Sequence, residues 1–147
     1  MPENFSHVSI RDIMTQNVIS VHEDDPIEHI FDLFDKYHFN TYPVINSEGK
    51  LTGIIDQDIM LEIIMFHRIP RTKHTHIAAV RSQGESAREI MIPHPVTISP
   101  DANLHDAADM MLKHHINRVC VTEDNKLVGI ISKKNIISEV FQRKEVK

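Results

Sequence analysis

Hydrophobic and polar positions follow the same order twice along the chain. In each copy a short segment ending in Ile-Met is followed by a β-branched run, an amphipathic helix, two apolar runs joined by a polar turn, and a further helix. The first amphipathic helix is predicted to begin at Asp25 as N-cap, with an apolar stripe at helical spacing formed by Ile27, Ile30, Phe31, Phe34 and Tyr37. Each copy therefore predicts the element order β-α-β-β-α, preceded by a short helix.

The two copies align at a constant spacing of 77 residues, which falls to 76 after the polar turn. The clearest matches are Asp12-Ile13-Met14 with Glu89-Ile90-Met91, Asn40 with Asn117, and Gly53-Ile54-Ile55 with Gly129-Ile130-Ile131. One residue has been lost in a hairpin loop, where a change of length costs little. We therefore predict an α/β (α+β) fold of two tandem repeats that pack face to face as one module, with a cleft between them.

Local signals place the remaining elements. Strands are predicted at Val18–Val21, Tyr42–Ile45, Lys50–Ile55, Val96–Ile98, Arg118–Thr122 and Lys126–Ile131. Helix N-caps are predicted at Ser9, Asp56 and Ser132, and a helix is predicted from about Ala102 to His115. The predicted organisation is a first repeat at residues 8–66, a linker at 67–86 and a second repeat at 87–141.

Composition limits the class of protein. A chain of 147 residues with 41% hydrophobic content can bury one sizeable core but not two independent ones. Because there is no long apolar run and no visible leader, we expect a cytoplasmic protein without membrane contact. The single Cys120 excludes an internal disulfide, and its place between Val119 and Val121 predicts a buried, inert thiol.

The net charge is -5, and the charged residues are distributed unevenly along the chain. Residues 1–60 carry 11 acids against three bases, whereas residues 67–88 carry five bases against one acid. The basic segment is interpreted either as a solvated linker or as an anion site, for a phosphate in the cleft or for a nucleic-acid backbone. It lacks aromatic residues and any recognition-helix or finger pattern, so a nucleic-acid partner is disfavoured.

Catalysis and metal binding have little support in the sequence. With four glycines the chain has no Walker-type or dinucleotide loop and no nucleophile elbow, so we expect no enzymatic activity. His74 and His76, and the pair His114-His115, lack ligand spacing and an accompanying carboxylate or cysteine cluster. No metal site is therefore predicted.

The recurring motifs resemble a known family. They are the Ile-Met segments, the strands at Tyr42–Ile45 and Arg118–Val121, and the Gly-Ile-Ile segments at Gly53 and Gly129. In this order, twice, they resemble the CBS (cystathionine-β-synthase) domain, and the pair resembles a stand-alone Bateman module. The resemblance implies repeats associated sheet to sheet with pseudo-twofold symmetry, a homodimer, and an adenosine-containing regulatory ligand, with no cofactor required.

The resemblance also implies ligand residues, chiefly in the second repeat. Arg118, with Asn117 beside it, takes the place of a phosphate-binding base, a task that suits a guanidinium because it pairs two oxygens. Ser132 and Asn135 take the places of a hydroxyl residue and of the Asp that accepts from ribose, although Asn is a weaker acceptor. The adenine base is expected beside Val96, Thr97, Ile98 and Val119, and the first-repeat ligand positions are Ser20, Asn40 and Thr41.

The first repeat departs from the family pattern. Thr41 carries no charge where the second repeat has Arg118, and Ile59 stands where an acceptor for ribose is expected. We therefore expect ligand binding chiefly at the second repeat.

The sequence favours a non-catalytic sensor that binds AMP, ADP, ATP or S-adenosylmethionine and signals through its dimer conformation to an unknown effector protein. A ligand-free dimerisation scaffold is the alternative favoured by the departures at Ile59 and Asn135. A nucleic-acid binder acting through the basic linker is a further alternative.

Overall fold

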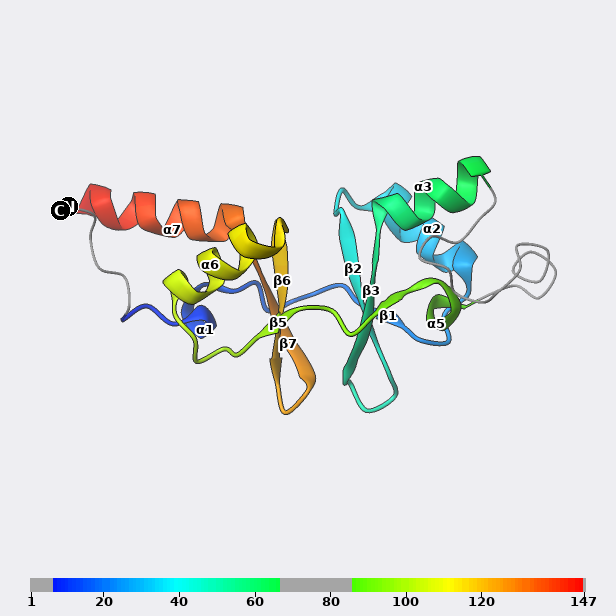
Figure 1. Cartoon of the computed structure of the whole chain (residues 1–147), viewed down its shortest axis with the longest axis horizontal. Coiled ribbons are helices and arrows are strands. Elements are labelled where there is room, and N and C mark those ends of the chain that lie inside the picture. The colour runs from blue at the N-terminus through cyan, green and yellow to red at the C-terminus, as the bar shows by residue number, and fades with distance from the viewer. Residues whose placement is uncertain (1–6, 67–85, 147) are drawn as a thin grey trace. The chain divides into compact units, whose positions relative to one another are not determined.

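The computed structural model describes residues 7–66 and 86–146, which form two compact units (Figure 1). The first-repeat unit comprises residues 19–66 and 86–95, and the second-repeat unit comprises residues 7–18 and 96–146. Each unit therefore contains segments of both sequence repeats. Within the described ranges, no helix is both long enough and apolar enough to cross a membrane.

The first-repeat unit is built on a four-stranded sheet in the order β1-β2-β3-β4. Its strands are β1 (Val21–His22), β2 (Thr41–Ile45), β3 (Leu51–Asp56) and β4 (Ile92–Pro93). Strand β1 runs parallel to β2, whereas β2 with β3 and β3 with β4 are antiparallel. The helices of this unit are α2 (Ile27–Lys36), α3 (Gln57–Phe66) and the single-turn α5 (Ala87–Ile90).

The second-repeat unit is built on a three-stranded sheet in the order β5-β6-β7. Its strands are β5 (Thr97–Ile98), β6 (Arg118–Glu123) and β7 (Lys126–Ser132), and its helices are α1 (Ile10–Ile13), α6 (Leu104–His114) and α7 (Lys133–Val146). Strand β5 is parallel to β6, and β6 is antiparallel to β7. The mixed α/β fold of two β-α-β-β-α repeats is thus confirmed.

The segment that opens each repeat pairs with the sheet of the other repeat. In the second-repeat unit, the Thr15 N–H donates to the Ile130 carbonyl at 2.8 Å, and the Ile130 N–H donates to the Thr15 carbonyl at 3.0 Å. In the first-repeat unit, Ile92 of β4 pairs with Ile54 of β3 in the same antiparallel sense. Since Thr15 and Ile92 are equivalent positions of the two copies, the opening segments are exchanged reciprocally.

A methionine from each exchanged segment lies against a glycine of the sheet. A Cβ atom at Gly129 would stand 2.6 Å from Met14 Sδ and 2.9 Å from the Thr15 carbonyl oxygen. At Gly53 the corresponding distances are 2.5 Å to Met91 Sδ and 2.8 Å to a backbone carbonyl oxygen. Only glycine leaves this space open, which explains why the Ile-Met and Gly-Ile-Ile motifs recur together.

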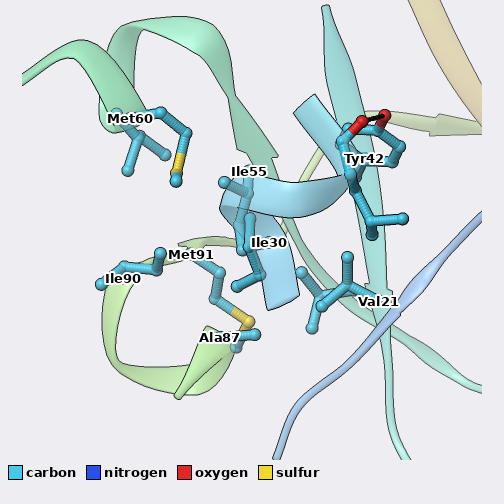
Figure 2. Close-up of a cluster of buried hydrophobic side chains, with 11 residues drawn as sticks. Val21, Ile30, Tyr42, Ile55, Met60, Ala87, Ile90 and Met91 are labelled. Carbon is cyan, nitrogen blue, oxygen red and sulfur yellow. Dashed lines mark hydrogen bonds between the residues drawn. The ribbon is translucent and has the colours of Figure 1, made fainter. Parts of the chain in front are cut away.

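The core of the first-repeat unit gathers side chains from its sheet and from α2, α3 and α5. Figure 2 shows Ile30, Tyr42, Ile55 and Ile90 within this cluster. Tyr42 is fully buried, and its hydroxyl donates to the Leu33 carbonyl at 2.7 Å, so the one polar group that this side chain brings into the core is satisfied.

Two predicted helix starts differ in detail from the structure. The N-cap of α2 is Pro26 and not Asp25, because the Asp25 carboxylate accepts from the His22 N–H at 2.9 Å and closes the turn after β1. Ser9 is the N-cap residue of α1, as predicted, but its hydroxyl donates to the Asp12 carboxylate at 3.1 Å and makes no capping bond to the backbone.

Candidate functional site

Two segments of the second repeat, residues 117–118 and Ser132, meet at one edge of the β5-β6-β7 sheet. Arg118 begins β6 and Ser132 ends β7, and the antiparallel register pairs these two residues directly. Asn117 precedes Arg118, and its carbonyl accepts from the N–H of Lys133, the first residue of α7, at 3.0 Å. We call the place where β6 begins and α7 begins the β6–β7 edge.

Ser132 and Asn135 form the N-terminal cap of α7. The Ser132 hydroxyl oxygen accepts from the Asn135 N–H at 3.1 Å, which confirms the predicted cap. In return, Asn135 Oδ1 accepts from the N–H and from the hydroxyl of Ser132, each at 2.9 Å. The side-chain oxygen Oδ1 of Asn135 therefore already accepts hydrogen bonds within the protein. The NH₂ group of the same side chain is a donor, and it is the group that Asn135 can offer to a ligand.

The residues expected beside an adenine base lie in and next to β5 and β6. Val96 directly precedes β5, and Thr97 pairs with Cys120 in the parallel register. The side chains of Ile98 and Val119 are 7% and 2% exposed and pack in the core of the second-repeat unit. These two residues therefore belong to the core and present little surface to a ligand.

The equivalent edge of the first-repeat unit has the same backbone arrangement with different side chains. Thr41 begins β2 and pairs with Asp56 at the end of β3, and the Asn40 carbonyl accepts from the first N–H of α3 at 3.0 Å. Asp56 Oδ1 accepts from the Ile59 N–H at 2.9 Å, which confirms Asp56 as a helix cap. The Ile59 side chain is 2% exposed in the core, so the position matching Asn135 presents no polar group.

The predicted ligand residues divide between the two units. Ser20 directly precedes β1 and lies with Asn40 and Thr41 in the first-repeat unit, whereas all predicted second-repeat residues lie in the other unit. The predicted basic linker falls outside the described residues, except for Ser86. Where the structure describes the chain, no three His, Cys, Asp or Glu side chains are grouped so that they could hold a metal ion.

The chemistry of Cys120 follows from its burial in β6. The side chain is 7% exposed, and burial raises the pKa of the thiol from 9.0 to about 12. The thiol is therefore neutral near pH 7 and a poor nucleophile. The predicted burial of this cysteine is confirmed.

Lys133 and Lys134 are not among the residues predicted from the sequence, yet they begin α7 at the β6–β7 edge. Lys133 is half-buried and Lys134 is exposed. The repeat spacing matches them with Gln57 and Asp58 at the start of α3. A signal for them exists in the sequence, because they directly follow the capping Ser132.

One family model matches this chain twice. The family model described as CBS domain matches residues 10–65 and 87–142. An uncharacterized protein of Methanocaldococcus jannaschii is 28% identical over 153 residues, covering 90% of each chain. The CBS domain-containing protein YhcV of Bacillus subtilis is 30% identical over 125 residues, covering 84% of this chain and 79% of its own. The chain also spans 22% of the length of an inosine-5'-monophosphate dehydrogenase of M. jannaschii at 23% identity.

Solved structures share the fold. CBSX2 in complex with AMP matches with a TM-score of 0.78 and 24% identity, over 93% of this chain and 98% of that one. The CBS domain of a bacterial CNNM/CorC family Mg²⁺ transporter in complex with ATP matches with a TM-score of 0.70 and 14% identity, over 92% and 89% of the two chains. The two matches to the family model together cover most of the sequence. The chain therefore belongs to the CBS domain family and carries two CBS domains in tandem.

Proposed function

We propose that this protein is a non-catalytic regulatory module that binds an adenine nucleotide at the β6–β7 edge. The observation that carries the proposal is the direct pairing of Arg118 with Ser132. It places the backbone of Arg118 beside the residue that precedes α7, and a guanidinium group and a helix N-terminus both favour an anion such as a phosphate. The AMP and ATP bound by solved relatives support this class of ligand.

The ribose would lie at the cap of α7. Asn135 Oδ1 already accepts two hydrogen bonds from Ser132, so the Asn135 amide would donate to a ribose hydroxyl, and the hydroxyl would not donate to it. Ribose hydroxyls can accept such a bond. The backbone of β5, at Val96 and Thr97, would contact the base.

The nucleotide proposal is tested by thermal unfolding of the chain with AMP, ADP, ATP, S-adenosylmethionine and NAD. A ligand at one hundred times its Kd stabilises the folded state by about 2.7 kcal/mol, which raises the Tm of a chain of this size by several degrees. Arg118→Ala removes the guanidinium at the β6–β7 edge, and Thr41→Ala is its matched control at the equivalent first-repeat position.

We expect a nucleotide to raise the Tm of the wild type and of Thr41→Ala, and to lose at least about tenfold in affinity with Arg118→Ala, since a charge-assisted contact contributes about 1.5–3 kcal/mol. A shift that Arg118→Ala leaves intact would place the ligand elsewhere. No shift with any of the five compounds would remove the proposal.

Signalling through a homodimer is the second part of the proposal. Large apolar side chains are exposed on both long helices that follow the sheets: Leu61, Ile64, Met65 and Phe66 on α3, and Ile137 and Phe141 on α7. The spacing of 76 residues matches Leu61 with Ile137 and Met65 with Phe141. Exposed apolar side chains of this kind mark protein interfaces, and contacts with a second copy would cover those on each helix.

The dimer is tested by the mass of the chain in solution. Leu61→Glu combined with Ile137→Glu places charge on both helices and should convert a dimer to a monomer in light scattering. Leu112→Glu is the control, because Leu112 is 68% exposed but lies on α6, which is neither of the two substituted helices. A wild type of monomeric mass at micromolar concentration would contradict the dimer.

A ligand can act through such a dimer only if it binds one arrangement of it more tightly than another. The partner that responds would be an effector protein. The expected sign of this coupling is a nucleotide affinity that differs between the wild type and the Leu61→Glu, Ile137→Glu variant.

A ligand-free dimerisation scaffold is the second candidate, and one observation favours it. The side-chain oxygen Oδ1 of Asn135 already accepts two hydrogen bonds from Ser132. The second repeat therefore offers a ligand no free acceptor at the place where the family pattern has a carboxylate. An intact dimer that shows no Tm shift with any nucleotide would support the scaffold.

A further inference from the structure

The two equivalent sheet edges differ sharply in charge. Four positions in the elements that meet at the β6–β7 edge are basic, namely Lys113, Arg118, Lys133 and Lys134. The repeat spacing matches them in order with Lys36, Thr41, Gln57 and Asp58, whose charges cancel. The backbone frame is shared, so the difference in charge is confined to the side chains.

These four bases belong to three elements, α6, β6 and α7. Lys113 lies in the last turn of α6, and His115 follows in a left-handed conformation, with φ 55° and ψ 44°, that turns the chain toward β6. The Lys133 N–H donates to the Asn117 carbonyl, which places the first turn of α7 beside the start of β6. Figure 1 shows α6 ending and α7 beginning at the same end of the β6–β7 hairpin.

The two lysines of α7 are the distinguishing part of this group. Lys113 has the counterpart Lys36 in the other edge, and Asp109 stands four residues before it on α6, where it can offset its charge. Lys133 and Lys134 replace a neutral and an acidic residue, so they add two positive charges and remove one negative charge relative to the first edge. They also stand at the positive end of α7, where cations are unfavourable for the helix itself.

We infer that the β6–β7 edge prefers an adenine nucleotide with more than one phosphate group over AMP and over S-adenosylmethionine. The inference rests on the proposed function and adds the class of ligand. One guanidinium group can pair two oxygens of a single phosphate, so further cations beside it gain affinity only from further negative charge on the ligand. The same cations repel the sulfonium group of S-adenosylmethionine. An anion bound beside the N-terminus of α7 would neutralise the two lysines and so remove their unfavourable interaction with the helix dipole.

The test compares the Kd values of AMP, ADP, ATP and S-adenosylmethionine by calorimetry, with a chelator present so that divalent cations do not mask phosphate charge. The variant Lys133→Gln with Lys134→Asp grafts the first-repeat residues onto α7. It leaves the Arg118–Ser132 pair in place, and an acid in the first turn favours the helix. Lys126→Gln is the charge control, because Lys126 is exposed at the opposite end of β7.

We expect the wild type to bind ATP at least about tenfold more tightly than AMP, a difference of about 1.4 kcal/mol. In the graft the ratio of the two affinities should fall to near one, while AMP affinity changes less than about threefold and Lys126→Gln behaves as the wild type. Raising the salt concentration should weaken ATP binding more steeply than AMP binding.

Three results would overturn the inference while leaving the proposed function intact: AMP binding as tight as ATP, S-adenosylmethionine binding tightest, or a graft that weakens AMP and ATP by the same factor. Absence of binding by all four compounds, in a protein that unfolds cooperatively, would remove the proposed function and this inference together.

Discussion

The equivalent sheet edges of the two units share their backbone hydrogen bonds but carry different side chains. In both, the first N–H of the following helix donates to the carbonyl before the central strand, from Gln57 to Asn40 and from Lys133 to Asn117, each at 3.0 Å. Three residues into each helix, however, Ile59 is buried in the core, whereas Asn135 is half-buried and hydrogen-bonded to the cap. The hydrogen-bond frame, which the fold needs, is common to both copies, and the side chains beside it differ, so ligand chemistry can belong to one copy alone.

The largest effect that separates the copies is expected at this helical position. Ile59→Ala removes buried apolar volume and should lower the free energy of unfolding by about 2–5 kcal/mol. Asn135→Ala removes one side of a helix cap and should cost about 1 kcal/mol. Urea unfolding measures both values, and equal losses would contradict the assignment of Ile59 to the core and Asn135 to the cap.

The exchanged opening segments predict an effect that is similar in both units. Gly129→Ala directs a methyl group against Met14 and the Thr15 carbonyl, and Gly53→Ala does the same against Met91, so each should cost about 1–3 kcal/mol through overpacking. Thermal unfolding of the two variants measures the effect. A large loss in one and none in the other would show that the two segments are not docked equivalently.

An effect that appears only at high pH belongs to the second-repeat unit alone, because Pro43 stands where that unit has Cys120. Burial raises the pKa of this thiol to about 12 in the folded state, against 9.0 for an unburied thiol. The unfolded chain therefore loses this proton at lower pH, and the contribution to stability that is complete below pH 9 is lost as the pH rises toward 12.

The measurement is the free energy of unfolding against pH for the wild type and for Cys120→Ala. The wild type should lose more stability than the variant between pH 9 and pH 12. In addition, a thiol reagent at pH 8 should modify the folded protein far more slowly than the unfolded one. Parallel pH curves would contradict the burial of the thiol.

The smallest expected effect concerns two exposed ion-pair groups at equivalent positions. Arg11 donates to Asp101 and to Glu123, each at 3.0 Å, and Arg88 lies 2.9 Å from Glu23 and 3.1 Å from Asp24, so each ties an opening segment to the unit on which it packs. Because all these distances join partly exposed groups, Arg11→Ala and Arg88→Ala should lower the Tm only slightly.

The dependence of these Tm differences on salt concentration provides a further test. At about 1 M ionic strength such exposed pairs are screened, so both arginine variants should then match the wild type in Tm. A decrease that persists at high salt would indicate that the arginine side chains act through packing and not through charge.

The sequence predicted the candidate ligand residues through their resemblance to the family pattern, and the repeat spacing showed where the two copies differ. That alignment identified Arg118, Ser132 and Asn135 as distinct from Thr41, Asp56 and Ile59. It did not identify Lys133 and Lys134, although they directly follow the capping Ser132, because only the fold places the start of α7 beside the start of β6. The acceptor expected at Asn135 is occupied by the cap, which depends on side-chain geometry.

The order of the elements was determined by the sequence itself, because hydrophobic periodicity and capping residues are local signals that act within a few residues. Their ends were less determined: the strand predicted at Val18–Val21 is observed at Val21–His22, since pairing with β2 decides which residues form a strand. Only the tertiary structure decided that Thr15 pairs with Ile130, and that Met14 lies against Gly129. Those contacts join segments more than one hundred residues apart, and no local preference of the chain encodes which sheet a segment will join.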